Sequence, residues 1–226
     1  MSVHAELLME SYVQAMASEK IRLVMKLRKS GITDTRVLAA MESTPREQFV
    51  EGAFLDRAYE DNALPIADGQ TISMPSVVAA MTQALQLEER HTVLEIGTGS
   101  GYQAAILAQL ARRVHTIERH RSLHQQAVER FAQMRLTNIT AHLGDGAKGW
   151  PHAAPYERIL VTCAAEEEPT ALLEQLADGG IMVLPLGEHV ADQELFRITR
   201  KGTEFVSERL FTVRFVPLVE KKQTTC

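Results

Sequence analysis

The strongest constraint on the fold is a regular alternation of short apolar runs and helical stretches that begins at residue 91. The apolar runs have the length and composition of buried strands, and they lie at residues 92–96, 113–117, 139–143, 158–162 and 180–186. Helical patterns separate several of them, at residues 102–111, 121–134 and 169–176. Strands that alternate with helices form right-handed crossovers, so their sheet is mostly parallel and covered on both faces. We therefore predict an α/β fold with a doubly wound, mostly parallel sheet.

The regions before and after this alternation have patterns of their own. Residues 4–29 indicate one or two amphipathic helices, and Thr33 or Asp34 can cap a short helix after them. Residues 45–75 show no sustained periodicity and are expected to form an ordered loop, after which Pro75 opens another helix.

Two β-rich stretches follow Gly187, at residues 193–200 and 204–215, and Lys201-Gly202 between them predicts a hairpin turn. They are expected to extend one edge of the sheet in antiparallel fashion. The chain is thus expected to form one domain, residues 1–226, in three parts: an N-terminal helical region, a core of alternating strands and helices, and a C-terminal β extension, at residues 1–90, 91–187 and 188–226.

Composition limits the partners and the location. The net charge of -5 lacks the cationic surplus of non-specific nucleic-acid binding, so no nucleic-acid partner is expected. The basic residues within 20–29 could form an RNA-binding face, but a solvated helix surface is the favoured interpretation. Cys163 and Cys226 do not make a disulfide framework, and no leader or membrane span is apparent. We expect a cytoplasmic protein, and a monomer because no heptad pattern remains.

The most informative segment joins an apolar strand to a glycine-dense turn and then to a helix. It runs from Val93 to Tyr102 and contains Gly97, Gly99 and Gly101. Glycines at such a turn let the backbone approach a ligand at the carboxyl end of the strand, which suits a nucleotide. The spacing is G-x-G-x-G, whereas the dinucleotide fingerprint is G-x-G-x-x-G. The turn therefore favours S-adenosylmethionine over a dinucleotide.

Three acidic residues stand at the ends of successive predicted strands. Glu95 can face the cationic methionine end of the cofactor, or it is a helix-capping or partly exposed strand-end carboxylate. Glu118, about 20 residues further on, can accept hydrogen bonds from the ribose hydroxyls. Asp145 can accept from the adenine amino group, or it belongs to an ordinary Asp-Gly turn. Together the three acids favour a nucleoside cofactor.

Nine segments carry a resemblance to a known family. Those that resemble the cofactor-fold motifs of the Rossmann-like class I S-adenosylmethionine-dependent methyltransferases lie at residues 93–108, 114–118, 144–146, 159–165 and 176–187. Those that resemble one branch, the protein-L-isoaspartate O-methyltransferases, lie at residues 44–50, 58–66, 69–75 and 213–218. The most distinctive is 69–75, Gly-Gln-Thr-Ile-Ser-Met-Pro, and the resemblance covers most of residues 15–218.

The resemblance implies an enzyme that esterifies the α-carboxylate of L-isoaspartyl residues in damaged proteins and peptides. The ester collapses to a succinimide, which can hydrolyse to normal aspartate. The implied cofactor is S-adenosyl-L-methionine, with S-adenosyl-L-homocysteine as product. The resemblance also implies that residues 91–187 form the cofactor-binding core and that residues 1–90 cover the substrate. Ala67-Asp68, where a glycine is common, and the acidic stretch at 164–168 leave open a specialised relative.

Position by position, the resemblance assigns the active-site role to Ser73. It implies cofactor contacts at Ile72, Ser73, Glu95, Ile96, Gly97, Thr98, Gly99, Ser100, Glu118, Asp145 and Gly146. A substrate carboxylate is already ionised at neutral pH, so no general base is needed and Ser73 is expected to position it. Ser73 is outside any G-x-S-x-G turn, which disfavours a hydrolase nucleophile. The histidines lack ligand spacing, so no metal site is expected.

Two other functions stay open. A class I methyltransferase acting on RNA or a small molecule would share the core, but it has no reason to carry the segments at 44–50 and 69–75. A non-catalytic module that keeps the fold as a scaffold is the other, and the intact Glu95, Gly97 and Glu118 argue against it.

Overall fold

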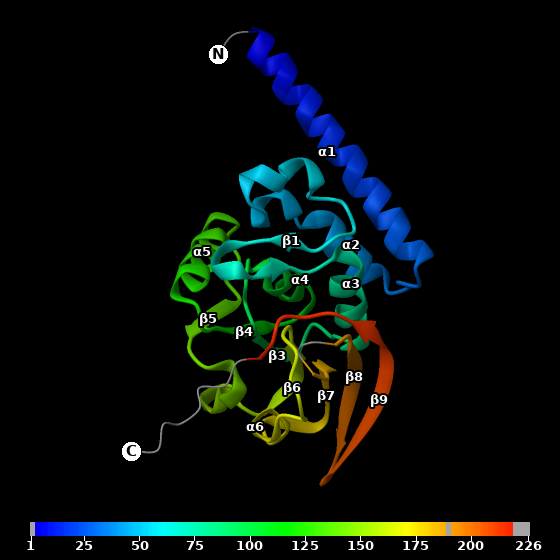
Figure 1. The fold of residues 1–226 in the computed structure, drawn as a ribbon, viewed down its shortest axis with the longest axis vertical. Coiled ribbons are helices and arrows are strands. Elements are labelled where there is room, and N and C mark those ends of the chain that lie inside the picture. The colour runs from blue at the N-terminus through cyan, green and yellow to red at the C-terminus, as the bar shows by residue number, and fades with distance from the viewer. Residues whose placement is uncertain (1–2, 189–190, 219–226) are drawn as a thin grey trace.

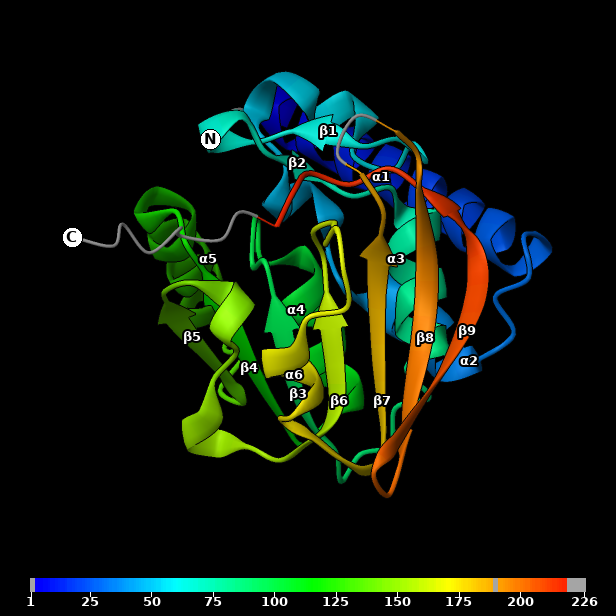
Figure 2. The same ribbon diagram turned by 60° about the horizontal axis from the view of Figure 1, so that its bottom comes forward.

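The computed structural model describes residues 3–188 and 191–218, and a seven-stranded sheet forms its centre (Figures 1 and 2). The strand order is β5-β4-β3-β6-β7-β8-β9, in which β5 to β7 are parallel and β8 and β9 are antiparallel to their neighbours. The strands are β3 Thr92–Ile96, β4 Arg113–Glu118, β5 Ile139–Leu143, β6 Tyr156–Val161, β7 Leu176–Leu186, β8 Gln193–Lys201 and β9 Glu204–Val213. The predicted doubly wound, mostly parallel sheet with an antiparallel edge is confirmed.

Both faces of the central strands β3 and β6 are buried, as expected in a parallel sheet. Neighbouring strand residues alternate between two apolar clusters: Val93 belongs to one and Leu94 to the other. The helices α4 Tyr102–Leu110 and α5 Arg121–Gln133 follow β3 and β4, where helices were predicted. The third predicted crossover helix is much shorter than expected.

That helix, α6, spans only Thr170–Leu173, whereas the sequence pattern predicted residues 169–176. The chain leaves the helix because Leu176 pairs with Tyr156 and opens β7, while the Tyr156 N–H donates to the Gln175 carbonyl at 2.8 Å. Sheet pairing therefore overrides a helical apolar pattern here.

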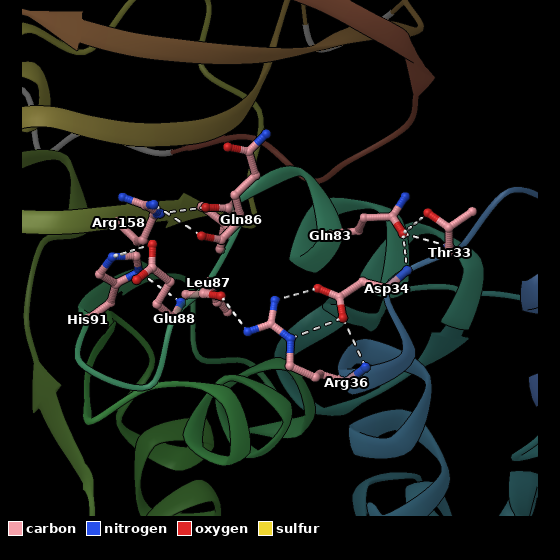
Figure 3. Close-up of polar contacts among 10 residues, drawn as sticks. Thr33, Asp34, Arg36, Gln83, Gln86, Leu87, Glu88, His91 and Arg158 are labelled. Carbon is pink, nitrogen blue, oxygen red and sulfur yellow. Dashed lines mark hydrogen bonds and ion pairs between the residues drawn. The ribbon is translucent and has the colours of Figure 1, made fainter.

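Three helices precede the sheet: α1 Val3–Lys29, α2 Thr35–Ser43 and α3 Pro75–Ala84. Asp34 is the residue that caps α2, with its side chain accepting from the Arg36 N–H. Gln83 of α3 ties down the connection between α1 and α2, because its Oε1 accepts from the Thr33 N–H at 2.7 Å and the Asp34 N–H at 2.9 Å (Figure 3). Among the described helices, none has the length and apolarity needed to cross a bilayer.

The predicted loop at residues 45–75 contains short ordered pieces. Three 3-10 turns, η1 Arg46–Phe49, η2 Gly52–Arg57 and η3 Ala67–Gly69, accompany a two-residue hairpin of β1 Leu64–Pro65 and β2 Thr71–Ile72. In Figure 2 this hairpin lies over the carboxyl ends of the parallel strands. The loop therefore covers the edge of the sheet where a ligand is expected.

The hairpin between β8 and β9 turns one residue later than predicted. Lys201 pairs with Glu204, so the turn residues are Gly202 and Thr203 rather than Lys201-Gly202. Gly202 has a φ of +62°, a conformation that glycine adopts without strain. Cys226 lies outside the described residues, and the other cysteine, Cys163, is a buried free thiol.

Candidate active site

A cavity opens at the carboxyl ends of β3, β4 and β6, with a volume of about 1030 Å³ counted to its open mouth. The chain passes from β3 to β4 on one side of β3, and β6 lies on the other side of β3. The strand order therefore reverses at this point, and open α/β sheets bind ligands at such a switch point. Much of its wall comes from residues 70–73, 96–100, 117–120 and 215–218, and single residues of other elements complete it.

The glycine-dense turn after β3 forms one wall, and its geometry requires glycine. Gly97 has a φ of +95°, and a Cβ there would lie 2.5 Å from Thr162 Oγ1. That hydroxyl lies 2.7 Å from the Gly97 carbonyl oxygen and bridges the ends of β3 and β6. Gly101 has a φ of +90°, and a Cβ there would lie 2.8 Å from the ring of Phe131. Both positions therefore require glycine, because of their φ and because of close packing against Thr162 and Phe131.

Glu118 ends β4 and lines the cavity beside the turn. Its Oε2 accepts a hydrogen bond from the Gly99 N–H at 2.8 Å, and its Oε1 accepts from the His120 N–H at 2.9 Å. Each carboxylate oxygen has a second acceptor site, so the fixed group can also receive ligand hydroxyls. This placement suits the predicted ribose contact.

Glu95 lies behind the cavity wall, beneath the glycine-dense turn. Its side chain is fully enclosed, with 0% exposure, and does not form part of the cavity wall. Thr116 Oγ1 donates to Glu95 Oε2 at 2.5 Å, and Thr116 in turn lies 2.6 Å from the hydroxyl of Thr98, which does line the cavity. Strand alternation turns Glu95 under the glycine turn, so the alternative of a partly exposed carboxylate is wrong, whereas the cofactor contact of Glu95 stays a prediction.

The surroundings of Glu95 also affect its charge. Burial, with a smaller contribution from the charge of Glu118, raises the pKa of Glu95 to about 8, although the Thr116 hydrogen bond opposes the shift. The group is therefore mostly protonated at neutral pH. Direct attraction between Glu95 and a cationic ligand stays a prediction that this arrangement does not favour.

Asp145 and Gly146 follow β5. Asp145 Oδ1 accepts from the Ala147 N–H at 3.1 Å and caps a short 3-10 turn, as the alternative of an Asp-Gly turn described. Gly146 lines the cavity, and a Cβ there would lie 2.4 Å from the Ile96 side chain. Glycine at position 146 therefore lets the chain pass close to the Ile96 side chain at the cavity wall. An adenine contact by Asp145 remains a prediction.

Ser73 lines the same cavity as Glu118 and lies in the segment between β2 and α3. Several other predicted residues share the cavity with it: Ile72, Ile96, Gly97, Thr98, Gly99 and Ser100. The structure thus brings together chain segments that are far apart in sequence, and it leaves the side chains of Glu95 and Asp145 off the wall.

The sequence interpretation did not assign a site role to the stretch from Phe215 to Leu218, which lines the cavity. Ala164 fixes it, because the Ala164 N–H donates to the Val216 carbonyl at 2.8 Å and the Leu218 N–H donates to the Ala164 carbonyl at 2.7 Å. The resemblance at 213–218 was the available signal. Cys163 also lines the wall, but burial raises the pKa of its thiol to about 12, so it is not a thiolate nucleophile at neutral pH.

Comparisons with known proteins agree with this geometry. The family model of Protein-L-isoaspartate(D-aspartate) O-methyltransferase (PCMT) matches residues 18–223. The protein-L-isoaspartate O-methyltransferase of Rhodospirillum centenum is 58% identical over 204 residues, 90% of this chain and 92% of that protein. The enzyme of that name from Rhodospirillum rubrum is 56% identical over 205 residues, 90% of this chain and 94% of that protein.

Solved structures show the same fold. A protein-L-isoaspartate O-methyltransferase structure has a TM-score of 0.82 at 28% identity, over 89% of this chain and 66% of that chain. A Plasmodium falciparum structure in complex with S-adenosyl-L-homocysteine has a TM-score of 0.78 at 24% identity, over 88% of this chain and 98% of that one, and supports the fold. The chain therefore belongs to the protein-L-isoaspartate(D-aspartate) O-methyltransferase family.

Proposed function

We propose that the protein transfers the methyl group of S-adenosyl-L-methionine to the α-carboxylate of L-isoaspartyl residues in damaged proteins and peptides. The observation that carries this proposal is that Ser73, from the family-specific segment, and Glu118, from the cofactor fold, line one cavity. A generic methyltransferase site would need only the second of these. The first step of isoaspartyl repair, formation of the methyl ester, is the reaction assigned to this cavity.

The walls suit a nucleoside with a charged end. Glu118 offers free acceptor positions for ribose hydroxyls, and the adjacent backbone at Gly97 and Gly99 can approach the ligand closely. Ile117 and Leu123 supply apolar surface near Glu118 for a base. S-adenosylmethionine, when bound, supplies an electrophilic methyl group on a sulfonium centre.

Ser73 is proposed to hold the substrate carboxylate by a hydrogen bond. That carboxylate is ionised at neutral pH, so the protein needs to align it and to remove water rather than to take a proton from it. The stretch from Phe215 to Leu218 lies on the same cavity and is proposed to close it over the peptide.

The test compares methyl incorporation into an isoaspartyl peptide and its aspartyl twin. We expect incorporation into the isoaspartyl peptide alone, and equal labelling of both, or of neither, would contradict the proposal. In the same assay Ser73→Ala is expected to lower turnover while cofactor affinity, measured by calorimetry, stays close to wild type. Asp145→Ala is expected mainly to weaken cofactor affinity, and loss of cofactor binding in the serine variant would refute this division of roles.

We also propose that the protein acts in the cytoplasm as a monomeric single domain without a nucleic-acid partner. The net charge of -5 supports the last point. Light scattering of the purified protein tests the monomer, and a mass of twice 25.1 kDa would contradict it.

A further inference from the structure

Arg46 is an enclosed cation whose ionic partner is missing from the part of the chain that the structure describes. Its side chain has 0% exposure, and none of the ion pairs among residues 3–188 and 191–218 includes it. Burial lowers the pKa of Arg46, as expected for a guanidinium removed from water. Its guanidinium carbon lies 4.7 Å from the centre of the Tyr102 ring, which partly compensates the charge. A buried cation of this kind is unfavourable unless its donors are used.

Two of the Arg46 nitrogens, Nε and Nη2, bind backbone carbonyls of the segment that covers the cavity, whereas Nη1 is buried without a hydrogen-bond partner among the described residues. Arg46 Nε donates to the Ala58 carbonyl at 2.8 Å, and Nη2 donates to the Ser73 carbonyl at 2.9 Å. A longer contact of 3.5 Å joins Nη2 to the Asn62 carbonyl. Because a guanidinium is a rigid planar fork, these bonds fix the backbone of Ser73 relative to residues 58–62.

Asp61 holds the same segment from its other end. Its Oδ1 accepts a hydrogen bond from the Ser76 N–H at 2.8 Å, and its Oδ2 lies 3.3 Å from Lys26 Nζ of α1. The short stretch from Ser73 to Ser76 is therefore fixed at both ends by side chains that do not line the cavity themselves.

We propose that Arg46 is a positioning residue for methyl transfer, which sets the location of the Ser73 hydroxyl through the Ser73 carbonyl, with Asp61 as its counterpart. The inference rests on the role proposed for Ser73 in carboxylate binding. A reacting group displaced by about 1 Å can lose about 100-fold in rate, so a backbone anchor at this residue has a direct effect on turnover.

The test uses Arg46→Lys, which keeps a cation and removes the planar fork. Arg158→Lys is the matched control, because Arg158 is also buried and donates to carbonyls, including that of Gln86 at 3.1 Å, away from the cavity (Figure 3). Both variants are expected to lose stability. Only Arg46→Lys is expected to lose turnover on an isoaspartyl peptide, by about 10- to 100-fold in kcat, with the cofactor Kd close to wild type.

Each outcome decides the inference. Wild-type kcat in Arg46→Lys, or an equal fall in Arg158→Lys, would overturn it, because the effect would then be absent or merely one of stability. If Arg46→Lys does not fold, Asp61→Ala decides: a lowered kcat with intact cofactor affinity supports the anchor, and a wild-type kcat overturns it. An inactive wild-type protein would instead contradict the proposed function, which separates the two failures.

Discussion

Replacing Glu95 by glutamine tests whether the carboxyl group under the glycine turn is neutral in the folded protein. Glutamine has nearly the same shape and keeps an oxygen that can accept from the Thr116 hydroxyl, but it cannot ionise. Glu95 Oε1 lacks a hydrogen-bond partner among the described residues, so an ionised carboxylate would have one buried oxygen without compensation. The substitution therefore removes a proton equilibrium while changing little else.

The sign and size of the effect follow from the pKa of Glu95. Burial raises it to about 8 in the folded protein from the ordinary 4.5. As the pH rises, the carboxyl group loses its proton at a lower pH in the unfolded chain than in the folded protein. The stabilisation linked to the neutral Glu95 is therefore complete below about pH 4.5 and is lost as the pH rises toward 8. Between pH 5 and pH 7, wild type should therefore lose roughly 2 to 3 kcal/mol more of its free energy of unfolding than Glu95→Gln.

Urea unfolding at pH 5, 6 and 7 measures this difference, with the fluorescence of Trp150, the single tryptophan, as the signal. The exposed Glu42→Gln variant controls for the removal of one carboxyl group. We expect the free energy of unfolding of Glu95→Gln, relative to that of wild type, to increase from pH 5 to pH 6 and again to pH 7. Parallel curves for the two proteins would refute a neutral Glu95.

Three further substitutions test other parts of the structure. Gly97→Ala should lower the free energy of unfolding by more than Gly31→Ala, because both have positive φ but only the first Cβ meets an atom, Thr162 Oγ1; equal losses in thermal unfolding would contradict this. Glu118→Gln should raise the cofactor Kd by about 10-fold or more, since an amide can accept only one of the two backbone hydrogen bonds, and unchanged calorimetry would count against it. Gln83→Ala should cost about 1 kcal/mol of stability with normal methyl transfer, and lost activity in the folded variant would disprove that separation.

The sheet could be predicted from the sequence because its parallel strands coincide with short apolar runs that alternate with helical patterns. The strand at Thr92–Ile96 and the strand at Ile139–Leu143 have the predicted bounds. The error at α6 arose where an apolar pattern fits either a helix or a strand, and only pairing of Leu176 with Tyr156 decides between them. Local patterns cannot supply that information, because the partner lies in another segment.

The site was predictable to the extent that strand ends determine it. Glu118 and the glycine turn could be placed from their positions after β4 and β3, since parallel strands end at one edge. The direction of the Glu95 side chain depends on which face of β3 it occupies, and the turn covers that face. The carbonyl contacts of Arg46 depend on how residues 58–73 fold back, which no local pattern encodes.

The outer strand β9 has a consequence for the behaviour of the protein in concentrated solution. It ends the sheet, and its residues from Glu204 to Arg209 are exposed, including the apolar Phe205 and Val206. An uncovered strand edge with apolar side chains favours edge-to-edge strand pairing between two molecules. Two features oppose such association: the charges of Glu208 and Arg209 on the same strand, and the irregular pairing near Leu195. The exposed edge strand is therefore protected against aggregation.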